Sequence, residues 1–499
     1  MAGVEGAPVS EFRRWLIFCA AIFPASLAVG TQTVANAVLP QMQGDLSAGL
    51  DQISWVITAA VVAAAIAIPP TAWLTARFGR RRLMMTGMLL FSGTSMMVGT
   101  AETLGGVVFW RMASAVSAAP MIALSQSVTL ETFSDEQRGK AFAFWAIGIL
   151  SGWVFAPALG AYVAEVHSWR LIFFLIGPLA VLGALTASIP PETERDTTLR
   201  FDWFGFGSLS LAIGSLLLVL NRGQRLDWFE SPEVIFFTAL GGIALYVFAV
   251  HTSYQERPLL RFRMFLDRNY SLGLVVVSAY AALSLAPLVL IPTMLEELRG
   301  LELLTTGVAL IPRGLSQIVG LLLVGMIVTR ADPRVFVVGG LLVFAYASAE
   351  MASFNLDVGL RDVLWPNLIH GFSMAFIWAP VANVIYGNLA PALRTDAVTF
   401  SSLLFSLSSS IGVSLSVTTL GRTFQQSHEE LAAHLTPANE MFRLSDWSTG
   451  WNLVDPAALG AMKAEVAQQA LMIGYTNVYW GTALYALAVI PFALLLRTR

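Results

Sequence analysis

Four ionisable side chains fall within long apolar stretches of this sequence, where a charge is unfavourable and therefore marks a functional site. They are Arg111, Arg313, Glu350 and His370. A carboxyl or imidazole group in such a place can take up and release a proton, and histidine titrates near neutral pH. The alternative is structural: the arginines would reach the membrane surface as flanking residues, and Glu350 and His370 would anchor the interface.

A second group of charges occupies a short turn between the apolar runs 53–73 and 83–101. Short basic loops resist translocation, so this turn belongs on the cytoplasmic side. We expect Arg77 and the neighbouring arginines to contact the cytoplasmic ends of later spans and close a gate, with Glu131 as the favoured partner; a purely topogenic role is the alternative. Arg330 lies in a similar turn between two later runs, which indicates a duplicated bundle of helices. The turn holds Arg77, Gly79, Arg80, Arg81 and Arg82.

Neutral polar residues are scattered among aromatic side chains in the apolar stretches. Each one alone is typical of a hydrogen bond between packed helices. Together they predict an apolar, aromatic cavity with few polar groups, which suits bulky lipophilic ligands better than sugars or phosphates. The residues are Asn36, Gln126, Gln317 and Asn383, with Trp145, Phe376 and Trp378.

Composition limits the class of protein. Of 499 residues, 56% are hydrophobic and only 12% charged, which only a polytopic membrane protein accommodates. The single cysteine, Cys19, excludes an intrachain disulfide. The sequence shows no metal-ligand cluster, phosphate-binding loop or paired carboxylates, so we expect no cofactor, no enzymatic activity and no nucleic-acid partner. A net charge of -3 says little about other partners.

The hydropathy pattern predicts an all-α protein with fourteen spans, which places both termini on the same side. Most of the 29 Lys and Arg residues then fall inside, so we expect both termini in the cytoplasm. The simplest organisation is an N-terminal six-helix bundle (1–189), a linker with two inserted helices (190–269) and a C-terminal six-helix bundle (270–499). The spans are 15–39, 52–73, 83–101, 105–128, 141–163, 170–189, 203–221, 233–252, 271–292, 304–328, 335–354, 363–386, 398–420 and 475–496.

A polar outer segment, 421–474, precedes the last span. From Asp455 to Ala470 it has an N-cap residue, a first-turn proline and periodic apolar residues that include Leu459, Met462 and Val466. This pattern predicts an amphipathic helix that leads into the last span. It either packs on its own protein or forms a docking surface.

Small residues recur at every fourth position of the fifth span, in Gly148, Gly152, Ala156 and Gly160, with Pro157 beside them. Such a stripe lets two helices approach closely, and the proline bends the helix.

The segment 152–161 resembles the antiporter motif of the major facilitator superfamily, in which Gly152, Pro157 and Gly160 match. The turn at 72–83 resembles the signature between helices 2 and 3 of that superfamily. The segments 33–40 and 222–231 resemble the fourteen-helix drug:proton antiporter branch, the EmrB/QacA group, and most of all EmrB-type inner-membrane pumps.

The resemblance implies two six-helix bundles plus two extra helices, and proton-coupled efflux of lipophilic or amphiphilic compounds across the inner membrane. It also implies a periplasmic adaptor protein and an outer-membrane channel as partners, besides membrane lipids. Export of an endogenous lipid, fatty acid or metabolite is the alternative. A transport-inactive scaffold or sensor is the second alternative.

Departures from the family pattern bear on mechanism. Thr31 stands where the family has an acid in helix 1, and Ala76 where the turn has an aspartate. The proton-coupling residue therefore cannot be carried over. We expect Glu350, His370 or another acid drawn into the cavity to take its place.

Overall fold

The computed structural model describes residues 10–196, 198–255, 258–327, 332–387, 389, 391–436 and 456–497. All regular secondary structure in these ranges is helical. Six spans come first and form the N-terminal bundle. Its helices are α1 (Glu11–Ala37), α2 (Leu39–Asp45), α3 (Leu50–Ile53), α4 (Trp55–Ala67), α5 (Thr71–Phe78), α6 (Arg80–Thr100), α7 (Leu104–Ala118), α8 (Pro120–Thr132), α9 (Asp135–Val166) and α10 (Trp169–Thr186).

Two further spans form a hairpin, and six more form the C-terminal bundle. The hairpin consists of α11 (Trp203–Arg222), the 3-10 turns η1 (Gly223–Leu226) and η2 (Trp228–Glu230), and α12 (Pro232–Tyr254); η3 (Phe262–Leu266) follows it. The C-terminal bundle consists of α13 (Arg268–Arg299), α14 (Leu303–Ile327), α15 (Pro333–Met351), α16 (Leu360–Gly387), α17 (Pro391–Ala433) and α19 (Pro456–Leu494).

Within the described residues, thirteen helices are long and apolar enough to cross a bilayer, and α4 with α5 makes a fourteenth. The prediction of fourteen spans is therefore confirmed. The span expected at 52–73 is not one straight helix, because its two parts meet at an angle of 53°. Pro69 and Pro70 stand at the break, where neither can donate an intrahelical hydrogen bond.

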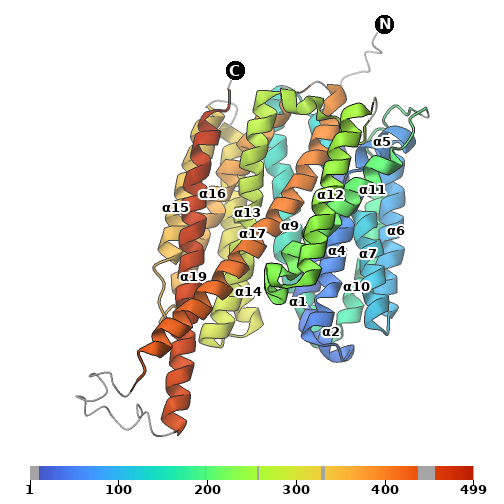
Figure 1. Ribbon diagram of the computed structural model, residues 1–499. Helices are drawn as coiled ribbons and strands as arrows, with labels where there is room; N and C mark the ends of the chain where they lie inside the picture. The colour runs from blue at the N-terminus through green and yellow to red at the C-terminus, as the bar shows by residue number, and fades with distance from the viewer. Residues whose placement is uncertain are drawn as a thin grey trace.

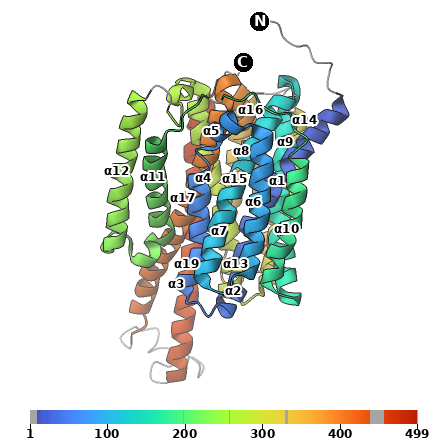
Figure 2. The ribbon, with the colours of Figure 1, turned by 90° about the vertical axis from the view of Figure 1, so that its right-hand side faces the viewer.

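The first span, α1, begins on the same face of the molecule on which the last span, α19, ends. The turn between α5 and α6 lies on that face as well (Figure 1). We call it the inner face because the arginine-rich turn lies there. Figure 2 shows α12 at the periphery, with α11 between it and the two bundles. The hairpin helix α11 contacts α4 of the first bundle and α17 of the second.

The largest hydrophobic core that the two bundles share includes Phe142 and Trp145 of α9 together with Tyr270, Trp378 and Tyr386 of the C-terminal bundle. A smaller shared core joins α9 to α14 and α16, and another joins α4, α7 and the hairpin to α17. Two further cores each belong to a single bundle. One contains only residues that precede α11, and the other joins the outer parts of α13, α15 and α19. The apolar contacts that join the two bundles are therefore concentrated toward the inner side, where they close the bundles against each other.

The helices α17 and α19 continue beyond the ends of the other helices on the outer face (Figures 1 and 2). With 43 and 39 residues they are about 60 Å long, twice the thickness of a bilayer core. The amphipathic helix predicted at 455–470 is thus the first part of α19. Its apolar face differs from the prediction: Met462 and Ala470 are buried, whereas Leu459 is 43% exposed. The residues 437–455 of the outer segment lie outside the described ranges.

Candidate functional site

An aromatic layer joins the two bundles at the level where their shared core ends. The indole of Trp145 on α9 stacks on that of Trp378 on α16, with ring centroids 6.2 Å apart and planes 24° apart. Tyr280 of α13 lies 5.3 Å from Trp378, and Phe405 of α17 lies 5.9 Å from it. We call these four residues the aromatic floor. Because four helices of both bundles contribute, the floor exists only when the inner side is closed.

The aromatic floor carries few polar groups. Gln317 donates a hydrogen bond from Nε2 to the hydroxyl of Tyr280 at 3.2 Å. Trp145 donates from Nε1 to the hydroxyl of Ser125 at 3.0 Å. Of the polar and aromatic residues predicted to share a cavity, the structure therefore brings together Trp145, Trp378 and Gln317.

The other predicted cavity residues lie elsewhere. Gln126 is fully buried, and its Nε2 has no hydrogen-bond partner among the described residues. Asn383 is half-buried on α16, and Asn36 is exposed at the outer end of α1. Phe376 packs on Phe372 at 4.8 Å instead of on the floor. Tyr280 and Phe405 were missed because one more aromatic residue in an apolar helix carries no distinguishing signal.

The buried arginine of the first bundle, Arg111 on α7, is only 3% exposed. Its guanidinium lies 5.7 Å from the ring centroid of Phe173 on α10, so it does not extend to the membrane surface. Its Nε has no hydrogen-bond partner among the described residues. Thr31, at the place of the missing acid, donates its hydroxyl to the carbonyl of Leu27 at 2.8 Å. The hydroxyl of Thr31 is thus bonded within its own helix, and this position offers Arg111 no counter-charge.

In the second bundle, Arg313 and His370 are buried where α14 crosses α16. Arg313 donates from Nη2 to the carbonyl of Ser284 at 2.6 Å. A side chain at Gly371 would collide with the Arg313 carbonyl, so the helices touch there. His370 is fully buried against Phe344, with ring centroids 3.9 Å apart, and neither ring nitrogen has a partner among the described residues. A role for His370 as an interface anchor is therefore wrong, because its side chain does not reach the surface.

Glu350 lies apart from these groups, at the outer end of α15. It lines a polar pocket of about 550 Å³ together with Asp357, Arg361, Asp362 and Trp365. Its Oε2 is buried and has no hydrogen-bond partner among the described residues. The pocket opens on the outer side of the C-terminal bundle, away from the aromatic floor.

The arginine-rich turn forms the expected ion pair with Glu131, and Arg80 is the arginine that makes it. Arg80 donates from Nη1 to Oε2 of Glu131 at 2.6 Å and is 2% exposed. Arg80 forms the pair instead of Arg77 because α5 ends at Phe78, and Gly79, with φ +90°, redirects the chain so that Arg80 begins α6. Such a φ favours glycine. Arg330, the predicted counterpart in the second turn, lies outside the described residues.

The antiporter-like stripe packs α9 on α1. Gly152 lies against the carbonyl of Ser26, and Gly160 against the side chain of Val34. Ser26 also donates its hydroxyl across the interface to the carbonyl of Gly148, at 2.6 Å. Pro157 lies inside α9. The close approach expected from the spacing of small residues is present.

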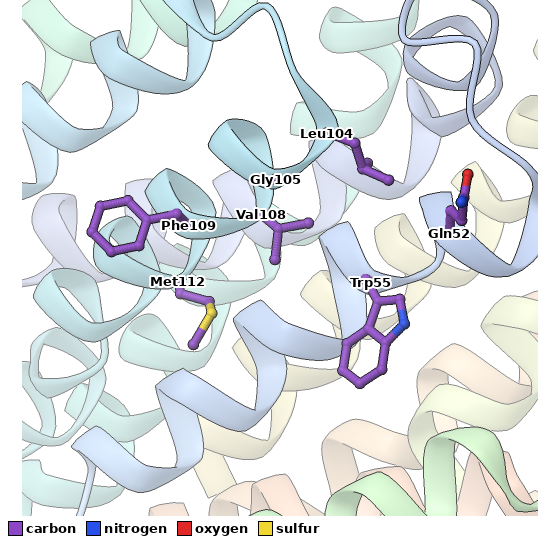
Figure 3. Close-up of a pocket in the computed structure, with 7 residues that line it drawn as sticks. All are labelled: Gln52, Trp55, Leu104, Gly105, Val108, Phe109 and Met112. Carbon is purple, nitrogen blue, oxygen red and sulfur yellow. The ribbon is translucent and has the colours of Figure 1, made fainter.

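An apolar crevice of about 410 Å³ lies between the outer ends of α4 and α7 (Figure 3). Trp55, Val108, Phe109 and Met112 line it, with the backbone of Gly105 at its edge. Phe109 is 60% exposed, so the crevice belongs to the outer surface of the N-terminal bundle. It is separate from the aromatic floor.

Comparison with known proteins shows which family this chain resembles. A family model described as Major Facilitator Superfamily matches residues 18–413. The multidrug export protein EmrB of Escherichia coli strain K12 is 29% identical over 470 residues, covering 92% of this chain and 91% of that protein. The fatty acid resistance protein FarB of Neisseria gonorrhoeae is 27% identical over 462 residues, covering 92% and 91%.

Among solved structures, the proton:xylose symporter XylE superposes with a TM-score of 0.65 at 14% identity, covering 98% of this chain and 97% of that one. This likeness concerns the fold.

Proposed function

The chain belongs to the Major Facilitator Superfamily and is a multi-pass protein of the inner membrane, and we propose that it exports lipophilic and amphiphilic compounds in exchange for protons. The similarity to a multidrug export protein and to a fatty acid resistance protein supports export of this class of compound. The two bundles would rock about a site near the middle of the membrane.

The aromatic floor is the observation that carries this proposal. Its rings come from both bundles and are largely buried at their contact, so a compound that binds between the bundles at this level contacts both at once. Broad apolar faces with few hydrogen-bonding groups bind flat lipophilic molecules by area and stacking, and they discriminate weakly among them. Opening the inner side separates Trp145 from Trp378, which links substrate contact to the transport cycle.

Accumulation of a fluorescent lipophilic cation in inverted, energised vesicles tests the proposal. We expect Trp378→Ala to lower kcat/KM about tenfold, equivalent to about 1.4 kcal/mol of lost contact. Trp203→Ala is the matched control, because Trp203 is 74% exposed at the start of α11, away from both the floor and the pocket of Glu350. Equal activity in both variants would remove the floor as the binding site. No accumulation by the wild-type protein would favour the transport-inactive scaffold.

Proton coupling requires a titrating group, and His370 and Glu350 are the candidates. His370 is buried without a hydrogen-bond partner among the described residues, so a proton gained there would have a large effect on packing. We expect His370→Gln or Glu350→Gln to abolish uphill efflux while downhill efflux continues. Unchanged pH dependence in both variants would eliminate both residues.

Export of fatty acids is the second candidate function. The resemblance to FarB supports it, and so does Arg313, which is buried and has no carboxylate partner among the described residues. An anionic head group is the chemistry that such an arginine complements. Under this alternative, Arg313→Gln abolishes efflux of a long-chain fatty acid and spares efflux of a lipophilic cation. Equal loss of both would assign Arg313 to the transport machinery in general.

The protruding pair of α17 and α19 is the proposed dock for a periplasmic adaptor that leads to an outer-membrane channel. The pair is held together close to the membrane, where Leu420 packs against Gly474. Replacing 425–468 by a short flexible linker therefore leaves that contact intact. We expect the variant to transport normally in vesicles but to lose adaptor co-purification and whole-cell resistance. If adaptor co-purification and whole-cell resistance both survive the replacement, the protruding part of α17 and α19 is only a structural cap.

A further inference from the structure

The N-terminus of α6 has an unusual charge distribution. Its first turn consists of Arg80, Arg81 and Arg82, although the N-terminal end of a helix is itself positive and favours acidic side chains. Gly79 precedes the helix and has no side chain to cap it, and position 76 is alanine. The first amide groups of α6 therefore need acceptors from elsewhere in the chain.

The segment 191–196, which we call the inner strap, supplies these acceptors from more than a hundred residues away. Thr193 accepts a hydrogen bond from the amide of Arg80, and Glu192 accepts one from the amide of Arg81, both at 3.1 Å. The amide of Asp196 donates to the carbonyl of Ala76 at 2.9 Å. The inner strap therefore holds both the end of α5 and the start of α6.

The Glu192 carboxylate lies at the centre of this arrangement. It also pairs with Arg195 at 3.0 Å, and it lies so close to Gly79 that a side chain there would collide with it. The strap carbonyl of Pro191 accepts a further hydrogen bond from Nη2 of Arg80 at 3.3 Å. The strap thus contacts the arginine that forms the ion pair with Glu131.

The ion pair in turn contacts the core shared by the bundles. Glu131 accepts hydrogen bonds from Arg80 and from the hydroxyl of Ser127, at 2.6 and 3.2 Å. Leu130 and Phe133, on either side of it, belong to the core that closes the two bundles at the inner face. A continuous set of contacts therefore runs from Glu192 through Arg80 and Glu131 to the inner closure.

We propose that Glu192 is a positioning residue of the inner gate: it caps α6 and holds Arg80 in place for Glu131, in a turn that lacks its own carboxylate. The inference rests on the proposed transport cycle. Losing Glu192 weakens the inner-closed state and raises the population that is open to the cytoplasm.

A cysteine reporter at the closed inner seam measures that population without any substrate. Cys19→Ser removes the only native cysteine. Ala143→Cys then places a thiol on α9 at a position that is 1% exposed and packs against Gly325 of α14. A water-soluble maleimide added to inverted vesicles reaches this thiol only when the inner side opens.

We expect Glu192→Ala to raise the labelling rate about tenfold, as fits the loss of one charge-assisted hydrogen bond, and Glu192→Gln to raise it less. Glu194→Gln is the control, because Glu194 is an exposed carboxylate of the same strap for which no ion pair is described. Glu131→Gln should raise the rate as well, and adding Glu192→Ala to it should change little, because both act through Arg80. Melting temperatures measured alongside separate gating from general destabilisation.

An unchanged labelling rate in folded Glu192→Ala, or full additivity with Glu131→Gln, would overturn the proposal. If Glu192→Ala does not fold, Glu192→Gln and Thr193→Val provide the same test with smaller changes. Failure of the proposed export function gives a different result: the labelling responds to Glu192, but the wild-type protein moves no lipophilic compound in vesicles.

Discussion

Gly152 offers a quantitative test of the packing between α1 and α9. A methyl group at this position would meet the carbonyl of Ser26, and the backbone nitrogen of Gly30 lies 3.3 Å away. Both obstacles are backbone, which cannot rotate aside, so the helices must separate. At Gly160 the nearest atom to such a methyl is a side-chain carbon of Val34 at 3.0 Å. At Gly93 nothing lies within 4 Å.

The magnitudes follow from two opposing effects. Alanine stabilises a helix by about 0.5–1 kcal/mol over glycine, and overpacking costs about 1–3 kcal/mol. We therefore expect Gly152→Ala to lower the free energy of unfolding by about 1–2 kcal/mol. Gly160→Ala should be close to neutral, and Gly93→Ala should raise stability by about 0.5–1 kcal/mol.

Unfolding in mixed micelles with increasing dodecyl sulfate, followed by circular dichroism, ranks the three variants. The predicted order of stability is Gly93→Ala, then Gly160→Ala, then Gly152→Ala. If Gly152→Ala is as stable as Gly93→Ala, the two backbones are not in contact, and the small-residue stripe has no packing role in this protein.

Three more outcomes are expected. Arg80→Ala should sharply raise cytoplasmic labelling of the Ala143→Cys reporter, whereas Arg77→Ala should change it little, because Arg80 forms the ion pair with Glu131. Equal effects of the two substitutions in the labelling assay would contradict this assignment. Arg111→Gln should abolish efflux in vesicles without lowering the melting temperature, because it removes a buried charge that has no counter-ion among the described residues. A large loss of stability would show that the arginine is structural. In the Cys19→Ser background, a cross-link between Gln224→Cys and Gly421→Cys should block transport until it is reduced, because these neighbours join the hairpin to the C-terminal bundle. A cross-link between Val62→Cys and Gly214→Cys, which joins the hairpin to the N-terminal bundle, should leave transport intact.

Composition and hydropathy alone determined the architecture. A bilayer demands long apolar helices whatever their partners are, so the number of spans and the orientation of the arginine-rich turn can be derived residue by residue. The close packing at Gly148, Gly152 and Gly160 could also be predicted from the sequence, because these small residues recur with the helical period within one segment. The absence of an acid at Thr31 is likewise a fact of the sequence.

The partners of each functional residue were decided only in the tertiary structure. Helices surrounded by protein and lipid are apolar on all sides, so their periodicity does not tell which face meets which neighbour. For that reason Trp145 and Trp378, which belong to different bundles and lie far apart in the sequence, could be suspected but not paired. Arg77 and Arg80 looked equivalent until the φ of +90° at Gly79 turned one of them toward Glu131. No local sequence pattern indicates that Glu192 caps α6. The cap joins two connecting segments that are brought together only by the packing of the first six spans.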